Sequence, residues 1–250
     1  MVTAILLAAG TGSRMGQGPL PKQFFCVGGV PILAHTLTRF ERVAAIDQII
    51  LVTRPQDRAR CEQILAEYEI SKIDTIVAGG KERQDSVWQG LQAVHPQTEI
   101  VLIHDVVRMF VTSTIITDVI EAAHKHRACV TAVPVKDTIK RAERHYSDPN
   151  NSAMVQSALS EEFFVVETLD RRSLWQIHTP QAFQYPFIRD IHEQARNIGL
   201  YGTDDAMLTE YFGYPVNIVQ GSYRNIKITT PDDLLIAETF LQHEGLSSNI

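Results

Sequence analysis

The chain has 250 residues, of which 44% are hydrophobic and 21% charged, and its formal net charge is −6. This composition is typical of a soluble globular protein with ample room for a core. The acidic balance argues against nucleic acid as a partner, and we expect no signal peptide and no membrane span. The three dispersed cysteines, Cys26, Cys61 and Cys129, form no zinc pattern and favour a reducing, cytoplasmic setting.

The first functional pattern follows a short apolar run at 5–7, which is suited to a buried strand. Gly10 and Gly12 come next, and two glycines so close let backbone N–H groups approach a bulky anion. Arg14 then offers a planar fork of donors and Lys22 a point charge, which together suit a polyphosphate. An ordinary strand-to-helix turn with solvated cations is the alternative.

Two better-known glycine loops do not match this stretch. A P-loop needs Gly-x-x-x-x-Gly-Lys-Ser/Thr, and no Lys-Ser or Lys-Thr follows the loop. A dinucleotide-binding turn needs Gly-x-Gly-x-x-Gly, whereas Met15 stands at the third glycine position and Gly16 comes one place late. The sequence therefore argues against a dehydrogenase.

The rest of the chain alternates predicted strands with predicted helices. We expect strands at 46–53, 73–78, 99–103, 128–135, 216–219 and 226–228. We expect helices at 31–40, 56–68, 114–126, 187–198, 204–211 and 231–241, the last followed by a frayed tail. This alternation predicts a single three-layer α/β/α domain over residues 1–250, with a mostly parallel sheet.

A second glycine turn, Gly79-Gly80, feeds another helix. The free N–H groups of a helix N-terminus are useful against a phosphate or a base edge. The alternative is that Asp85 or Ser86 only caps this helix.

The predicted strand 99–103 runs directly into His104 and Asp105. A carboxylate at the C-terminal end of a central parallel strand lies where open α/β sheets bind ligands. Asp105 could hold Mg²⁺ against a phosphate, because Mg²⁺ prefers one or two carboxylates with substrate oxygens. A capping role is the alternative. His124 and His126 are two apart on a helix, so they face different sides and predict no metal site.

Two β-prone segments flank a polar, turn-rich middle that contains Asp148-Pro149-Asn150-Asn151. This pattern predicts a hairpin arm at about 138–171 that projects from the domain. We expect the arm to mediate dimerisation.

The motifs together resemble a known family. In chain order they are Leu7-Ala8-Ala9-Gly10-x-Gly-x-Arg14, Pro21-Lys22-Gln23, Gly79-Gly80-x-Glu82-Arg83, Asp85-Ser86, His104-Asp105, Asp137-Thr138-Ile139-Lys140, Leu169-Asp170-Arg171, Thr179-Pro180-Gln181, Thr203-Asp204 and Asn225-Ile226-Lys227. Any one of them is weak, but their ordered combination over roughly 3–242 resembles the 2-C-methyl-D-erythritol 4-phosphate cytidylyltransferases of the non-mevalonate isoprenoid route.

The resemblance implies a Rossmann-like nucleotidyltransferase fold, and a homodimer that exchanges its β-arm. It implies CTP as co-substrate, Mg²⁺ held by Asp105, and Arg14, Lys22 and Lys227 around the CTP phosphates as the catalytic groups. Nucleotide contacts are implied at Ala8, Ala9, Gly10, Gly12, Gly80, Lys81 and Ser86. Contacts to the sugar phosphate are implied at Asp105, Arg108, Thr138, Thr179 and Thr203, and at Arg171 of the neighbouring subunit's arm.

The chemistry of such a transfer agrees with these residue types. A phosphate monoester is mostly ionised at pH 7, its second pKa being about 6, so it needs no general base to attack CTP. The reaction needs alignment and cations around the phosphorus. This requirement explains a candidate site that is rich in Arg and Lys and poor in His.

The chain departs from the family pattern after Asp105. Where the family usually reads His-Asp-Ala-Ala-Arg-Pro, this chain has Val106, Val107 and Met109. The valines add bulk beside the expected metal ligand, and the loss of proline frees the backbone. Lys81 also stands where the family often has an acidic or neutral residue, and the arm is longer than expected.

Two other functions compete with this interpretation. A ribitol-5-phosphate cytidylyltransferase is favoured by Leu20-Pro21-Lys22-Gln23-Phe24 and by Val107, whereas the segments at 137–141 and 169–175 favour the methylerythritol enzyme. A nucleotide-binding module without activity is the second alternative, and the retention of Arg14, Lys22, Asp105 and Lys227 argues against it.

Overall fold

The computed structural model describes residues 1–10, 20–144 and 162–247. They form two compact units, 1–132 with 177–250 and 133–176, and each unit is considered by itself. Within the described ranges, every helix is too short or too polar to cross a membrane.

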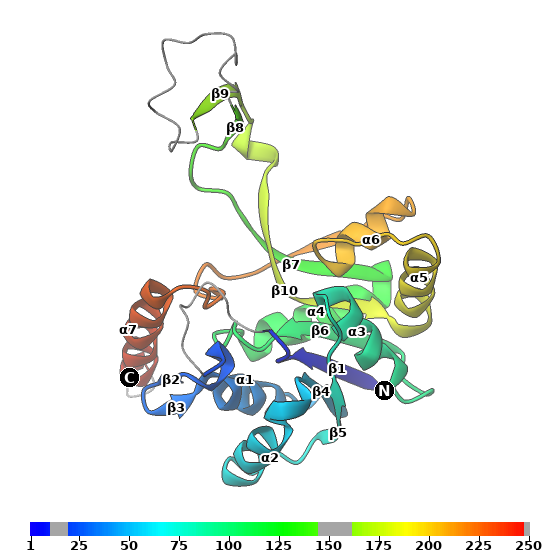
Figure 1. Ribbon diagram of the computed structural model, residues 1–250, viewed down its shortest axis with the longest axis vertical. Helices are drawn as coiled ribbons and strands as arrows, with labels where there is room; N and C mark the ends of the chain where they lie inside the picture. The colour runs from blue at the N-terminus through cyan, green and yellow to red at the C-terminus, as the bar shows by residue number, and fades with distance from the viewer. Residues whose placement is uncertain (11–19, 145–161, 248–250) are drawn as a thin grey trace, which may run out of the picture. The chain divides into compact units, whose positions relative to one another are not determined.

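The larger unit is built on a seven-stranded sheet with the order β11-β7-β10-β6-β1-β4-β5 (Figure 1). Its strands are β1 (Val2–Leu7), β4 (Gln48–Thr53), β5 (Ile73–Ala78), β6 (Ile100–Asp105), β7 (Ala128–Pro134), β10 (Trp175–Gln184) and β11 (Asn217–Gln220). β1 pairs in parallel with β4 and β6, β5 with β4, and β11 with β7, whereas β10 runs antiparallel to β6. The predicted mostly parallel sheet is therefore confirmed.

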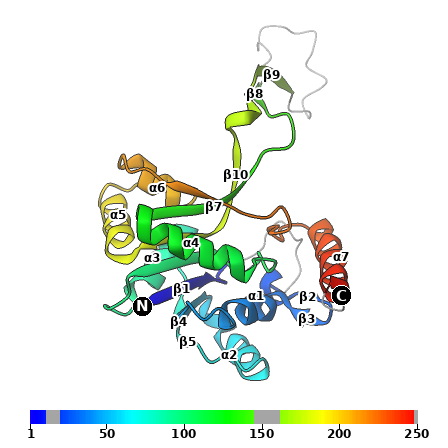
Figure 2. The same cartoon turned by 180° about the vertical axis from the view of Figure 1, so that it is seen from behind.

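Helices cover both faces of this sheet. Because side chains alternate along a strand, Ala4 and Leu6 of β1 join one hydrophobic core and Ile5 joins the other. The first core is covered by α1 (Ile32–Glu41), α2 (Arg58–Glu67), α4 (Ser113–His126) and α7 (Pro231–Ser247). The second core is covered by α3 (Arg83–Gln92), α5 (Tyr185–Asn197) and α6 (Asp205–Tyr211). In Figure 2, which is seen from behind, α4 lies across the first face.

Short elements complete the larger unit. They are η2 (Lys22–Phe24), the two-stranded pair β2 (Cys26–Val27) and β3 (Val30–Pro31), and η3 (Pro55–Asp57).

Helix α3 approaches the sheet closely at Gly90. A Cβ atom at this position would lie 2.6 Å from Cγ2 of Ile5 and 3.3 Å from Cγ2 of Val52, both in buried strands. Glycine therefore lets α3 lie directly on β1 and β4. The contact holds the C-terminal half of α3 against β1 and β4.

The sequence-based boundaries differ from the structure at three places. The segment 226–228 is irregular, not a strand, although Ile228 is fully buried and its N–H donates to the carbonyl of Val107. β10 was missed because its centre, His178 to Gln181, is polar and contains Pro180, which is rare inside a strand. Helix α7 continues to Ser247, past the expected end at Leu241.

The smaller unit contains the predicted hairpin. β8 (Lys140–Arg144) pairs antiparallel with β9 (Phe163–Thr168), and η5 (Arg171–Ser173) follows. The expected turn-rich middle at 145–161 lies outside the described residues. All four side chains of 163–166 on β9 are exposed although they are apolar.

Candidate functional site

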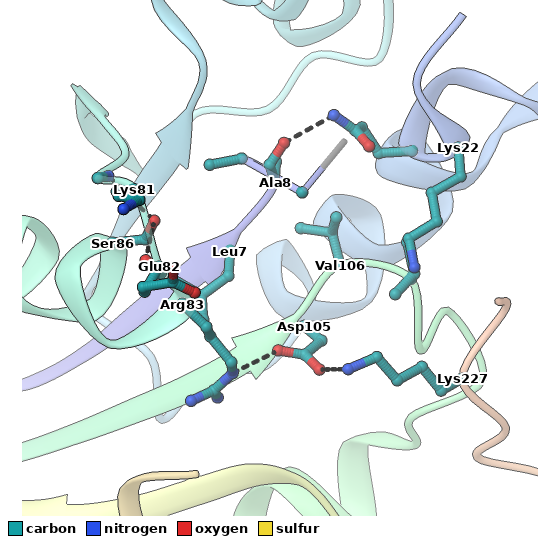
Figure 3. Close-up of a pocket in the computed structure, with 15 residues that line it drawn as sticks. Leu7, Ala8, Lys22, Lys81, Glu82, Arg83, Ser86, Asp105, Val106 and Lys227 are labelled. Atoms are coloured by element: carbon teal, nitrogen blue, oxygen red, sulfur yellow. Dashed lines mark hydrogen bonds and ion pairs between the residues drawn. The ribbon is translucent and has the colours of Figure 1, made fainter. Parts of the chain in front are cut away.

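A cavity of about 290 Å³ opens where β1 and β6 end (Figure 3). The register aligns Leu7, the last residue of β1, with Asp105, the last of β6, so both strands end at the same edge. Nine of the residues singled out in the sequence line the cavity, namely Ala8, Ala9, Gly10, Lys22, Gly80, Lys81, Ser86, Asp105 and Lys227.

The second glycine turn is dictated by close approach to β1. A Cβ atom at Gly79 would lie 2.4 Å from Cβ of Ala9, and one at Gly80 would lie 2.3 Å from Cβ of Asp85. No real Cβ atom fits in such spaces. The pair therefore lets the start of α3 close one wall of the cavity.

The start of α3 combines a capping group with a cavity-lining hydroxyl. Glu82 and Asp85 form a reciprocal capping box, so Asp85 caps this helix. Ser86 Oγ accepts from the N–H of Gly80 at 3.1 Å and donates to the carbonyl of Glu82 at 3.2 Å. The same side chain lines the cavity.

Gln23 ties the opening loop to the strand before it. Its Nε2 donates to the carbonyl of Ala8 at 2.7 Å, and its side chain is almost fully buried. This bond holds the backbone on both sides of the loop, which brings Lys22 to the cavity wall.

Asp105 lies between two cations (Figure 3). Its Oδ2 accepts from Lys227 Nζ at 2.7 Å, and its Oδ1 accepts from Arg83 Nε at 3.3 Å. Burial alone would raise the pKa of Asp105, but the charges of Arg83 and Lys227 hold that pKa far below its usual range. The carboxylate is therefore ionised near neutral pH.

Arg83 is a site residue to which sequence reasoning gave no role. Its Nη1 donates to Asp205 Oδ2 at 2.7 Å, and Asp205 also contacts His192 Nε2 at 3.0 Å. Burial by itself raises the pKa of Asp205, but the charge of Arg83 lowers it. The Glu-Arg pair after two glycines was a signal for Arg83. Its pairing with Asp205, 122 positions away, could not be predicted from the neighbouring sequence.

A second cavity, of about 310 Å³, adjoins the first. It is lined by five residues that the resemblance had singled out, namely Asp105, Arg108, Thr179, Thr203 and Lys227. Asp105 and Lys227 line both cavities, so the two spaces meet at their ion pair.

The hydroxyl of Thr179 holds the end of β6. Its Oγ1 accepts from the backbone N–H of Asp105 at 3.1 Å and lies 3.1 Å from His104 Nδ1. Since burial lowers the pKa of His104 to about 3, the imidazole is neutral near pH 7 and accepts from the hydroxyl at Nδ1. The other ring nitrogen faces the carbonyl of Arg108. Thr179 therefore supports Asp105 besides lining the cavity.

Arg108 is held beneath the second cavity. Its Nη1 donates to the carbonyl of Asn225 at 2.8 Å, and Asn225 Nδ2 donates to the carbonyl of Thr179 at 2.9 Å. Burial lowers the pKa of Arg108. Asp204, the expected N-cap, accepts from the N–H of Met207 at the start of α6.

The other four expected site residues fall in two groups. Thr138 and Arg171 belong to the smaller unit, where Arg171 Nη1 donates to the carbonyl of Lys136 at 2.9 Å. Arg14 and Gly12 lie outside the described residues. Their roles stay predictions.

The departures after Asp105 are absorbed by buried packing. Val106 and Val107 line the first cavity, and Met109 is fully buried in the core. Thr36 Oγ1 donates to the carbonyl of Val106 at 2.6 Å, and Ile228 donates to that of Val107. These bonds fix the backbone at Val106 and Val107. We expected this segment to be freer because it lacks the family's proline.

Asp105 fits Mg²⁺ as a single protein ligand. Mg²⁺ usually keeps several waters and is bound by one or two carboxylates with substrate phosphates. A carboxylate offers about four lone-pair sites, and the two cations occupy two of them. Within the described residues, no group of three His, Cys, Asp or Glu side chains could hold a metal by itself.

A mostly parallel α/β sheet with glycine turns and cations at its carboxyl edge defines a nucleotide-binding enzyme. Residues 2–243 match the model of the 2-C-methyl-D-erythritol 4-phosphate cytidylyltransferase (IspD) family. The chain belongs to this family of CTP-dependent nucleotidyltransferases.

Relatives of the same name are similar over nearly their whole length. The chain is 46% identical to one from Geobacillus kaustophilus over 238 residues, with 95% of this chain and 96% of the relative covered. It is also 46% identical to one from Syntrophus aciditrophicus over 244 residues, with 97% of each covered.

Solved structures agree with this assignment. The 4-diphosphocytidyl-2C-methyl-D-erythritol synthase of Anaerococcus prevotii superposes with a TM-score of 0.79 at 36% identity over 96% of each chain. The cytidylyltransferase of Thermus thermophilus superposes with a TM-score of 0.69 at 29% identity, over 95% of this chain and 98% of that one.

The Asp205–Arg83 pair should contribute strongly to stability. We expect Asp205→Asn to lower the free energy of unfolding by about 3 kcal/mol at pH 7, because it breaks the ion pair of a fully buried carboxylate and leaves the half-buried guanidinium of Arg83 with Asp105 alone. The difference from wild type should shrink as the pH falls below the ordinary Asp value of 3.8, because the folded-state pKa is lowered and the stability it contributes is lost on acidification. Urea unfolding at several pH values measures both effects.

Asp118→Asn, at an exposed aspartate on α4, is the control for this change. The same loss of one carboxylate charge on the surface should leave the unfolding midpoint close to that of wild type. Equal stability of the two variants would contradict the importance of the buried pair.

Proposed function

We propose that this protein transfers CMP from CTP to 2-C-methyl-D-erythritol 4-phosphate, which releases pyrophosphate and forms 4-diphosphocytidyl-2-C-methyl-D-erythritol. The observation that best supports this function is that two adjoining cavities meet at Asp105 and Lys227. Glycine turns bound the first cavity, and Arg108 lines the second. A transfer between two bound substrates needs such a meeting point.

The nucleotide would occupy the first cavity. Its walls offer backbone groups at Ala8, Gly10 and Gly80 and the hydroxyl of Ser86, which can contact a base and a ribose without bringing charge to them. The start of α3 supports this orientation, because a helix N-terminus favours electron-rich groups. Lys81, next to Gly80, also lines this cavity.

The reaction itself requires charge at the α-phosphorus. An oxygen of the acceptor's phosphate forms the new P–O bond, and the bond to the pyrophosphate leaving group breaks. Lys22 and Lys227, with Arg14 from the opening loop, would stabilise the extra negative charge of the crowded phosphorus. None of these groups has to move a proton, because the acceptor phosphate is already an anion.

We propose Asp105 as the protein ligand for Mg²⁺. When bound, the ion would neutralise charge on the CTP phosphates. The protein's role is to keep the Asp105 carboxylate ionised where the two cavities meet. Arg83 and Lys227 do this by lowering the pKa of Asp105.

The whole chain would act as one catalytic domain that dimerises through its hairpin arm. Phe163, Phe164 and Val165 on β9 are 61%, 55% and 61% exposed, and a run of exposed apolar side chains on a strand marks an interface. The resemblance assigns Thr138 and Arg171 of this arm to the acceptor site of the other subunit.

A cytoplasmic location is supported by the cysteines. Cys61 and Cys129 are buried as free thiols and Cys26 is an exposed thiol, which fits a reducing compartment. Recovery of the protein in the soluble cytosolic fraction would test this location.

Pyrophosphate release tests the function directly. With CTP and Mg²⁺ we expect release with 2-C-methyl-D-erythritol 4-phosphate and much less with D-ribitol 5-phosphate. Clear preference for ribitol 5-phosphate would keep the reaction type but overturn the proposed acceptor. Binding of CTP without release from either acceptor would favour a silent nucleotide-binding module.

Lys227→Ala should lower kcat about 10²- to 10³-fold, the usual effect of removing a group that stabilises charge in the transition state. The far-UV circular dichroism should stay unchanged, since Lys227 lies in an irregular segment. Lys125→Ala, an exposed lysine on α4, is the control and should retain full activity. A normal kcat for Lys227→Ala would remove this residue from the site.

Exchange of the arm predicts complementation between two inactive variants. In a mixed dimer of Arg171→Ala and Lys22→Ala subunits, one of the two sites would combine intact residues from both chains. Random mixing should restore about a quarter of the wild-type activity. If two well-folded variants stay inactive after mixing, the sites are not shared between subunits.

A further inference from the structure

The second cavity is lined by a histidine that has no role in the proposed reaction. The His178 side chain lines this cavity but not the first one, and the residue is 8% exposed. Its Nδ1 is shielded from solvent and has no hydrogen-bond partner within the described chain. Buried polar atoms are nearly always paired, so this nitrogen requires an explanation.

Two neighbouring cations show the same deficit. Nη2 of Arg83 and Nε of Arg108 are also buried without a partner among the described residues, and both side chains line the same cavity. All three nitrogens belong to side chains that line one cavity, and a ligand with several hydrogen-bonding oxygens would suit them. An acceptor with a phosphate and a chain of hydroxyl groups has this character.

We propose that His178 binds a hydroxyl group of the acceptor's polyol chain and so helps to select the acceptor. This inference rests on the proposed function and names one residue that would contact the acceptor substrate.

The arrangement of the cavity separates the two ends of the acceptor. The acceptor's phosphate has to reach the nucleotide, so it belongs near Asp105 and Lys227, which line both cavities. His178 lines only the second cavity, with Thr203 and Asp204 as further polar neighbours. The polyol chain, which extends away from the phosphate, is therefore the part that reaches His178.

The protonation state of His178 suits an alcohol as partner. Burial, assisted by the charge of Arg108, lowers the pKa of His178 to about 4, so the ring is neutral near pH 7. A neutral imidazole has one donor and one acceptor nitrogen, which match the two capacities of a hydroxyl group. The charged groups that face the same cavity are Arg83, Asp105, Arg108, Asp204 and Lys227.

The test compares acceptors as well as variants. His178→Leu removes both ring nitrogens, and His178→Asn keeps one donor and one acceptor on a shorter side chain. Each is assayed for pyrophosphate release with 2-C-methyl-D-erythritol 4-phosphate and with analogues that lack one hydroxyl each. His126→Leu, an exposed histidine on α4, is the control.

We expect His178→Leu to raise the KM for the acceptor about three- to tenfold, the effect of one lost uncharged hydrogen bond. The KM for CTP should stay at the wild-type value, and His178→Asn should recover part of the loss. One deoxy analogue should be used equally well by wild type and His178→Leu, because the contact it lacks is the one that the variant lacks.

Three other results would overturn the proposal. An equal loss with every analogue would assign His178 to the phosphate, and a parallel rise of the KM for CTP would mean a purely structural role. An unchanged KM for the acceptor would exclude the contact. If wild type itself released no pyrophosphate with this acceptor, the proposed function would fail first and the inference with it.

Discussion

The candidate site depends on one buried carboxylate held between two cations. Asp105 ends a central strand, Arg83 reaches it from the start of α3, and Lys227 comes from a segment 122 residues further along the chain. A buried charge that loses its partner destabilises a protein by about 3–5 kcal/mol. Each element that carries one of these charges is therefore held in position by the others, and the two cavities meet at this pairing.

The electrostatics of the site contrast with those of the whole chain. The protein carries a net charge of −6, yet arginine and lysine gather at the carboxyl edge of its sheet. The histidines there add no charge near neutral pH, because burial lowers the pKa of His104 to about 3 and that of His178 to about 4. These two histidines therefore add no charge that varies across the physiological pH range.

Much of the fold followed from local patterns, and the exceptions have physical causes. Buried parallel strands such as β1 and β4 are continuous apolar runs, and the amphipathic α4 and the capped α6 have clear signals. β10 was missed because its side chains serve the site more than the core: Thr179 supports Asp105, and Gln181 accepts from the N–H of Asp205. Conversely, Ile226 and Ile228 on either side of Lys227 pack against the first core, but this segment does not pair in a ladder.

The sequence alone determined the class of fold, the two glycine turns and the strand-end carboxylate, because each depends on neighbouring residues and on steric rules of the backbone. The ordered motifs also indicated the family. Only the tertiary structure decided the charge partners of Asp105, the buried pair of Arg83 with Asp205, and the unpaired nitrogen of His178. These features join residues far apart in the chain, and burial, which sets their energies, exists only after the chain has folded.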